Sequence, residues 1–240
     1  AHRELVQTFW QSPQIPHQQG TKAVDMFDQI KTGKIKAVWI MATNPMVSLP
    51  NRAQIEAALK QCDFVVVSDC VVKNDTLAFA DVALPATTWA EKDGTVTNSE
   101  RCISRQKGLL PAPGLAKHDW QMISEVAQKM GFDAAFDYSH PSEIFTEHAA
   151  LSGYRNTHDT TAGPTIIRDF DISGLASLSR TQYDQLEPIQ WPVNTLHPNG
   201  CKQMFSDNVF FTPSKKAQFI SVEHIPPKYD TTPEYPLVLN

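Results

Sequence analysis

Polar side chains stand directly after two short apolar runs, and their types suit the binding of a nucleotide. Asn44 follows the run over 35–41, and Ser68 and Asp69 follow the run over 64–67. A carboxylate can accept paired N–H donors from a guanine edge, or hydroxyl donors from a ribose. The alternative is local, with Asn44 forming an Asx turn and Asp69 capping the next turn. Position alone leaves both interpretations open.

A second group of polar residues lies further along the chain. Lys92 stands in the turn over 91–94, which ends in glycine, and a lysine there can hold a phosphate as a point charge. A solvated surface turn explains the same residues at least as well. Asp119 opens a stretch with helical spacing and is expected to be its N-terminal cap. No nucleophile–base pair stands out, so no catalytic residue is predicted.

Several familiar sites are missing from the sequence. The glycines form neither G-x-G-x-x-G nor a Walker A motif, which disfavours a standard nicotinamide site and a phosphate loop. The four cysteines stand far apart without C-x-x-C, so zinc ribbons and iron–sulfur ligand runs are unsupported. The eight histidines do not cluster. We therefore predict no metal site within this chain.

The elements that must position the polar residues follow a regular order. Short strands are expected over 35–41, 64–67 and 82–84, with a helix over 51–60 capped by Asn51. Such an alternation with compact loops implies a parallel sheet with helices on its faces and strands buried on both sides. Open parallel sheets bind ligands just past the carboxyl ends of their strands.

The remainder of the chain is more irregular. The patterns predict extended segments, two helices and a hairpin, over 95–97, 103–106, 119–130, 142–150, 209–212 and 217–222. The fold class is α/β with a mostly parallel sheet, followed by an irregular α+β connecting region. We place the boundary between the two parts at residue 150.

Composition excludes several broad classes of function. The chain has 240 residues, a net charge of −5, 41% hydrophobic and 20% charged residues, which is ordinary for a globular protein. The negative charge argues against sequence-independent nucleic-acid binding, and no apolar run approaches the ~20 residues of a membrane span. The start lacks the features of a signal peptide. We expect a cytoplasmic protein with reduced thiols, cut from a longer chain.

Three stretches together resemble the molybdopterin oxidoreductase family, whose members bind a bis-molybdopterin guanine dinucleotide. They are 37–45 (AVWIMATNP), 65–69 (VVVSD) and 80–101 (ADVALPATTWAEKDGTVTNSER). The flanking residues are similar to the catalytic subunit of bacterial assimilatory nitrate reductases, although formate dehydrogenases share the core motif. The resemblance implies an oxidoreductase that converts nitrate to nitrite. Alternatives are a formate dehydrogenase-type member and a non-catalytic nucleotide-binding module.

The resemblance also implies an arrangement of domains. Residues 1–150 would be half of a Rossmann-like three-layer lobe that binds the guanine dinucleotide. Residues 151–240 would connect it to a C-terminal domain, whose first strand would be 235–240. The molybdenum cofactor and a 4Fe-4S cluster would belong to the full-length protein, with the cluster ligands outside this chain. The partner would be the remainder of the polypeptide, with no assigned electron donor, and the isolated fragment would be inactive.

Family binding roles transfer to five positions of this sequence. Asn44 matches the loop residue that approaches the cofactor, and Ser68 and Asp69 match the pair at the strand end. Lys92 matches the lysine of the E-K-x-G turn, and Asp119 matches the aspartate that opens the later helix. The roles of the last two rest mainly on the resemblance.

One departure from the family stands beside these positions. The family has two arginines in E-R-R, and here Cys102 replaces the second. This puts one contact in doubt but leaves the expected fold unchanged.

Overall fold

The computed structural model describes residues 2–156, 168–227 and 230–238. The chain divides into two compact units, residues 1–202 and 203–240. Every helix and strand of the described residues lies in the first unit. The fold that positions the predicted site is therefore built entirely from that unit.

The hairpin expected in the second unit is wrong. Segments 209–212 and 217–222 form no strand, and the backbone bonds from Phe210 N to Lys215 O (3.1 Å) and from Lys215 N to Thr212 O (3.0 Å) close only a turn between them. The apolar side chains of this part are exposed, and Phe219 is fully so. A two-stranded hairpin with no surface to bury against is marginal in water.

Two other predictions concern the strand expected over 235–240 and the boundary at residue 150. Residues 235–238 contain no strand, and 239–240, which complete the predicted strand, lie outside the described residues. The domain boundary at residue 150 stays a prediction.

A three-stranded parallel sheet carries the first half of the chain. It contains β1 (Ala37–Met41), β2 (Phe64–Asp69) and β3 (Val82–Pro85), in that spatial order. The register aligns Trp39 with Val66 and Val66 with Val82. The α/β class with a parallel sheet, expected from the alternating pattern, is confirmed.

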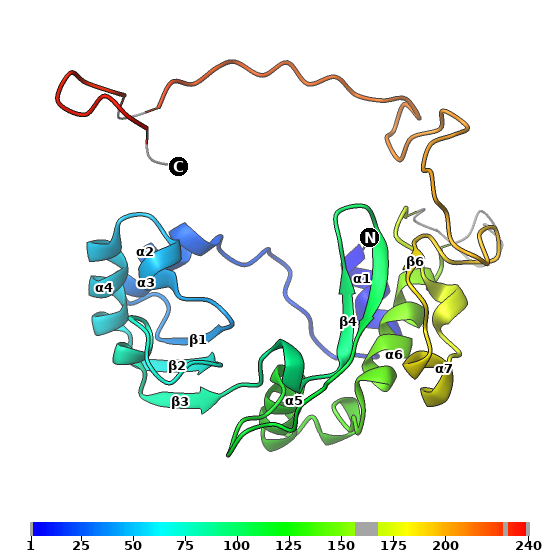
Figure 1. Cartoon of the computed structure of the whole chain (residues 1–240), viewed down its shortest axis with the longest axis horizontal. Helices are drawn as coiled ribbons and strands as arrows, with labels where there is room; N and C mark the ends of the chain where they lie inside the picture. Colours follow the sequence, from blue (N-terminus) through cyan, green and yellow to red (C-terminus); the bar gives the residue numbers. More distant parts are fainter. Residues whose placement is uncertain (1, 157–167, 228–229, 239–240) are drawn as a thin grey trace. The chain divides into compact units, whose positions relative to one another are not determined.

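The connections of this sheet lie on one of its faces. Figure 1 shows α2, α3 and α4 on the same side of the strands. These helices are α2 (Ala23–Lys31), α3 (Pro45–Ser48) and α4 (Arg52–Gln61), and the short 3-10 helix η1 (Leu77–Phe79) packs against the same core. Right-handed crossovers that advance in one direction along a sheet all lie on one face. The order β1-β2-β3 therefore places every connection beside the same core.

No helix of the described residues packs on the opposite face of this sheet, and its apolar side chains are only partly buried, so the predicted full burial on both faces is wrong. Val65 and Val67 point toward the helices and are buried, whereas Phe64 points the other way and is 45% exposed. Val82 at the β3 edge is also exposed. A continuous apolar strand pattern indicates that both faces of a strand can be buried. The connections between β1, β2 and β3, however, place helices on only one face of the sheet.

The second half forms a small antiparallel sheet with helices beside it. The strands are β4 (Gly94–Thr97), β5 (Cys102–Gln106) and β6 (Ile189–Gln190). The helices of this half are α5 (Asp119–Lys129), α6 (Pro141–Gly153), α7 (Arg180–Asp184), η2 (Trp89–Glu91), η3 (Asp133–Ala135) and η4 (Ser173–Leu175). Helix α1 (His2–Phe9), from the start of the chain, lies beside them, since the Phe9 ring contacts the Tyr154 ring. A second apolar core contains Ile103, Phe145, Ala149, Ile172, Leu175, Tyr183 and Val193.

Two predicted helix caps differ from the observed ones. Asn51 precedes α4 but adopts a left-handed backbone (φ 58°), and its side chain donates to Gln54 Oε1 instead of capping the helix. Asp119 lies inside the first turn of α5, and His118 stands at the N-cap position. An aspartate in the first turn still interacts favourably with the positive end of the helix dipole.

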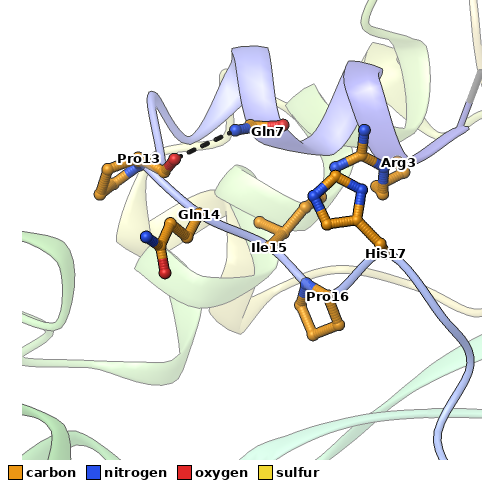
Figure 2. A pocket seen from close by; sticks show the side chains of 7 residues that line it. All are labelled: Arg3, Gln7, Pro13, Gln14, Ile15, Pro16 and His17. Atoms are coloured by element: carbon orange, nitrogen blue, oxygen red, sulfur yellow. Dashed lines mark hydrogen bonds between the residues drawn. The ribbon is translucent and has the colours of Figure 1, made fainter.

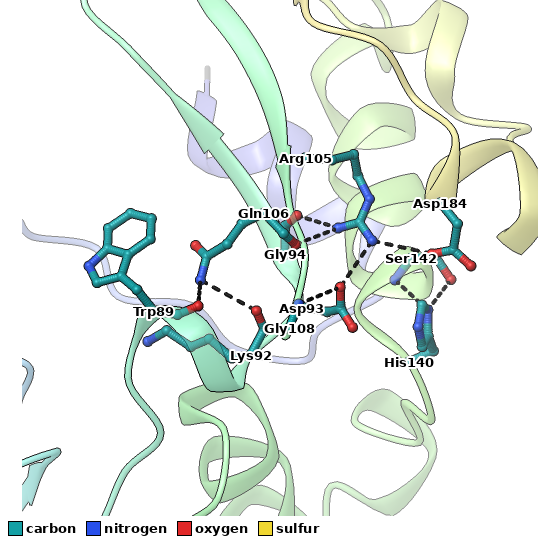
Figure 3. Close-up of polar contacts among 10 residues, drawn as sticks. All are labelled: Trp89, Lys92, Asp93, Gly94, Arg105, Gln106, Gly108, His140, Ser142 and Asp184. Carbon is teal, nitrogen blue, oxygen red and sulfur yellow. Dashed lines mark hydrogen bonds and ion pairs between the residues drawn. The ribbon is translucent and has the colours of Figure 1, made fainter. Parts of the chain in front are cut away.

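Arg105 on β5 ties the antiparallel sheet to α7. Its side chain is only 4% exposed and lies 3.2 Å from carboxylate oxygens of both Asp93 and Asp184. The guanidinium stacks over the Tyr183 ring, 4.0 Å from its centroid. It also donates to the carbonyl oxygen of Gly94, and Figure 3 shows this bond beside the contacts to Asp93 and Asp184. One buried cation thus satisfies groups from two strands and a helix.

We predict that Arg105→Ala lowers the free energy of unfolding by about 2–3 kcal/mol, because it removes several charge-assisted bonds and the packing of the buried guanidinium on the Tyr183 ring. Urea unfolding measures this change. Arg52→Ala is the matched control, since Arg52 pairs with Asp75 at the surface (2.7 Å) and its loss should cost about 1 kcal/mol or less. Equal losses in the two variants would contradict the buried role of Arg105.

Candidate functional site

The carboxyl ends of the three parallel strands meet at one edge of the sheet. Met41 is aligned with Ser68, and Asp69 is aligned with Pro85 at the end of β3. Asn44 follows β1 by three residues and precedes α3. The parallel register therefore brings the Asn44 loop and the Asp69 strand end to the same edge, as the sequence predicted.

Asn44 is fixed by a side chain from a distant part of the sequence. Its Oδ1 accepts a bond from Thr76 Oγ1 at 2.6 Å, and Thr76 Oγ1 also accepts from the backbone N–H of Met46 at 3.3 Å. Asn44 is half-buried, and its side chain makes no cap for α3. The Asn44 side chain therefore bonds to Thr76 and forms no Asx turn, and only the backbone carbonyl of Asn44 accepts bonds from the turn that follows it.

The Asp69 carboxylate accepts bonds through both oxygens. Oδ1 accepts from Val71 N at 3.2 Å, and Oδ2 accepts from Asn74 Nδ2 at 2.7 Å. The first contact is the local turn considered from the sequence, and the second comes from the β2–β3 connection. The carboxylate remains half-buried at the sheet edge. Since a carboxylate offers about four lone-pair sites, it can still accept bonds from a ligand.

Ser68 lies on the other face of the sheet from Asp69. Its hydroxyl is buried (1% exposed) and accepts a bond from Trp39 Nε1 at 2.6 Å. Adjacent residues of a strand point to opposite faces, so the structure does not bring the Ser68 and Asp69 side chains together. The Ser68 hydroxyl instead secures the indole on the uncovered face.

Lys92 and Asp119 form an ion pair near the end of β3. Lys92 Nζ lies 2.9 Å from Asp119 Oδ2, and each side chain is about 30% exposed. Backbone bonds connect this pair to the sheet edge, since Ala86 N donates to Asp69 O (3.0 Å) and Lys117 N donates to Pro85 O (3.1 Å). The two groups of predicted residues are thus joined through the backbone that follows β3.

His118 and Thr87 lie beside this ion pair. His118 Nδ1 is 2.9 Å from Thr87 Oγ1, and Thr87 is buried (1% exposed). Burial lowers the pKa of His118 below its ordinary value of 6.5, while Asp93 and Asp119 raise it and Lys92 lowers it. The imidazole is therefore neutral at pH 7 and can share one hydrogen bond with the Thr87 hydroxyl.

No role was assigned to Thr76, Thr87 or His118 from the sequence. These side chains do not themselves stand at strand ends, which was the signal used to find candidates. A better signal for finding them is a hydroxyl or amide side chain on the connections that return to the sheet edge. These connections are residues 70–81 and the segment after residue 85.

A groove elsewhere in the chain contains none of the predicted residues. It has a volume of about 720 Å³ and lies between α1 and the segment that follows it, as Figure 2 shows. Its lining is Arg3, Gln7, Pro13, Gln14, Ile15, Pro16 and His17. Across the part of the chain that the structure describes, no cluster of three or more His, Cys, Asp or Glu residues suits a metal ion. No helix of the described ranges is long and apolar enough to cross a bilayer.

The comparison with protein families decides the identity of the fold just described. The family model described as "Molybdopterin oxidoreductase" matches residues 4–129, which include all five predicted site residues. The chain belongs to the molybdopterin oxidoreductase family. The resemblance inferred from the stretches 37–45, 65–69 and 80–101 is therefore confirmed.

The relatives of this chain include proteins named nitrate reductase and proteins named formate dehydrogenase. It is 44% identical to a nitrate reductase of Klebsiella oxytoca and 45% identical to one of Shewanella frigidimarina, over 97% and 99% of this chain. It is 31% identical, over 98% of its length, to the F420-dependent formate dehydrogenase 2 subunit alpha of Methanococcus maripaludis. The chain spans about a quarter of the length of the two nitrate reductases.

A solved structure supports the architecture. Acetylene hydratase from Pelobacter acetylenicus superposes with a TM-score of 0.56 at 21% identity, over 80% of this chain and 23% of that one. At this level of identity the likeness shows the fold.

The lowered pKa of His118 predicts a dependence of stability on pH. Because the unfolded imidazole takes up a proton more readily than the folded one, stability is complete above about pH 6.5 and falls as the pH drops below it. Urea midpoints between pH 5 and 7.5 should show a steeper decline for the wild-type protein than for His118→Gln. Parallel curves for the two proteins would contradict this assignment.

Proposed function

We propose that this chain is the part of a molybdenum-dependent nitrate reductase that binds guanine dinucleotide of a bis-molybdopterin guanine dinucleotide cofactor. The observation that carries the binding role is that Asp69 and Asn44 lie at the same sheet edge, each held by a hydrogen bond from the β2–β3 connection. The 44–45% identity to proteins named nitrate reductase supports the activity. The whole protein's reaction is thus part of the proposal.

The residues at this edge fit the chemistry of such a group. Asp69 presents a fixed acceptor, which suits the adjacent N–H donors of guanine or the hydroxyls of ribose. Asn44, with its Oδ1 occupied by Thr76, retains an amide N–H donor for a carbonyl or phosphate oxygen. Lys92 would contribute N–H donors for a phosphate, and Asp119 holds it in place. Because the Asp119 carboxylate neutralises the charge of Lys92, the ammonium group would contribute directed hydrogen bonds more than net electrostatic attraction.

When bound, the cofactor would supply oxygen-atom and electron transfer at its molybdenum. The residues of this chain would bind and orient the nucleotide at a distance from the metal. Ser68 would contribute through the strand backbone and its contact with Trp39, since its hydroxyl faces away from Asp69. A 4Fe-4S cluster, the remainder of the polypeptide as partner and a cytoplasmic location belong to the same proposal.

A formate dehydrogenase is the second candidate, because a protein of that name aligns with 98% of this chain. Its lower identity, 31% against 44–45%, makes nitrate the favoured substrate. A stand-alone nucleotide-binding module is not favoured by any relative named above.

We predict that the full-length protein oxidises a reduced dye in the presence of nitrate and releases nitrite. The same preparation should not reduce an oxidised dye when formate is supplied. Spectrophotometric assays of both reactions on one preparation separate the two candidates. Formate oxidation without nitrite release would replace nitrate reductase by the second candidate.

We predict that Asp69→Ala in the full-length protein freed of its cofactor weakens GDP binding about tenfold or more. The reason is the loss of a charge-assisted hydrogen bond, worth about 1.5–3 kcal/mol. Calorimetric titration measures the affinity. Glu56→Ala, which removes an exposed carboxylate on α4, is the control and should leave the affinity unchanged. An unchanged affinity in Asp69→Ala would exclude this carboxylate as a nucleotide ligand.

A further inference from the structure

The connection between β2 and β3 reaches back to the loop after β1 through one hydroxyl. Thr76 lies on this connection, and it is completely buried (0% exposed). Its Oγ1 is placed between the backbone N–H of Met46 and Oδ1 of Asn44, at 3.3 and 2.6 Å. It thus binds the loop that carries a proposed nucleotide ligand, although 32 positions separate Thr76 from Asn44.

The hydrogen-bond capacity of Thr76 determines which way the Asn44 amide points. A hydroxyl has one proton to donate, and Thr76 Oγ1 already accepts the Met46 N–H. If the Asn44 amide were reversed, its NH₂ would face the hydroxyl, and the buried proton of Thr76 would lose its acceptor. Leaving a buried donor unsatisfied is costly. The arrangement therefore keeps Oδ1 of Asn44 inward and directs its NH₂ away from Thr76.

We propose that Thr76 is a positioning residue that fixes the Asn44 amide as a hydrogen-bond donor to the bound guanine dinucleotide. This inference rests on the proposed function of the same sheet edge. Thr76 does not touch the nucleotide, and it acts through Asn44. Its role is to fix the orientation of the amide before binding, so that binding need not select one of two orientations.

The same connection also orders the acceptor of the site. Asn74 donates to Asp69 Oδ2 at 2.7 Å, and its own Oδ1 accepts from Leu77 N at 2.7 Å. One short segment thus holds Asn44 as a donor through Thr76 and Asp69 as an acceptor through Asn74. The sheet edge therefore presents a hydrogen-bond donor at Asn44 and an acceptor at Asp69. Both are oriented by neighbouring residues of the β2–β3 connection.

A double-mutant cycle on the full-length protein freed of its cofactor tests the proposal, with GDP as the probe. The variants are Thr76→Val, Asn44→Ala and the combination of the two. Valine keeps the shape of threonine and replaces the hydroxyl with a methyl group. We expect each single variant to weaken GDP binding about three- to tenfold, the effect of one neutral hydrogen bond. The double variant should be no weaker than Asn44→Ala alone, because Thr76 acts only through Asn44.

Two further variants separate positioning from general stability. Thr76→Ser restores the hydroxyl and should return the GDP affinity to within about twofold of wild type. Ser152→Ala removes another buried hydroxyl, which bonds Ala149 O and Ile172 N in the second core. It should lower the urea midpoint as Thr76→Val does, yet leave the GDP affinity unchanged.

The outcomes distinguish this inference from the proposed function. If GDP does not bind, or Asn44→Ala leaves its affinity unchanged, the proposed role of Asn44 fails and the positioning role fails with it. If Asn44→Ala weakens binding while Thr76→Val does not, or if the two losses multiply in the double variant, Asn44 keeps its role and Thr76 loses its own. Failure of Thr76→Ser to restore affinity would likewise overturn the positioning role.

Discussion

The parallel alignment of β1, β2 and β3 is the constraint on which the candidate site depends. Because the three strands run in the same direction, their carboxyl ends meet at one edge and bring Asn44 and Asp69 to it. The backbone after β3 extends this edge to Lys92 and Asp119 through bonds made by Ala86 and Lys117. If one of these strands ran in the opposite direction, its carboxyl end would lie at the other edge of the sheet. The polar residues that follow that strand would then be separated from the rest of the site.

The same winding explains why the sheet has one covered and one open face. Both connections lie beside the core that contains Ile55, Leu59 and Val67, so the segment has no helix left for the side of Phe64. The second half of the chain is organised differently, around Arg105, whose buried charge joins strands and a helix. Apolar packing thus shapes the first half, and a buried, ion-paired cation joins the elements of the second.

Most polar contacts at this sheet edge join residues that lie far apart in the sequence. Thr76 bonds Asn44 across 32 positions, and Lys92 pairs with Asp119 across 27. These bonds are short and partly or wholly withdrawn from water, where a hydrogen bond orients its partners more strongly. The edge is therefore held by hydrogen bonds within the chain itself, which suits the proposed binding role in a protein of the molybdopterin oxidoreductase family.

The sequence by itself determined the order of strands, the parallel sheet and the polar strand ends, because apolar periodicity and turn residues act locally. It also carried the family, through motifs spread over residues 37–101. Only the tertiary structure decided that Ser68 faces away from Asp69 and that the sheet is covered on one side. It alone revealed Thr76, because a buried hydroxyl acquires its partner from packing. The hairpin expected over 209–222 failed for the same reason, since a local pattern forms strands only where a surface is available to bury them.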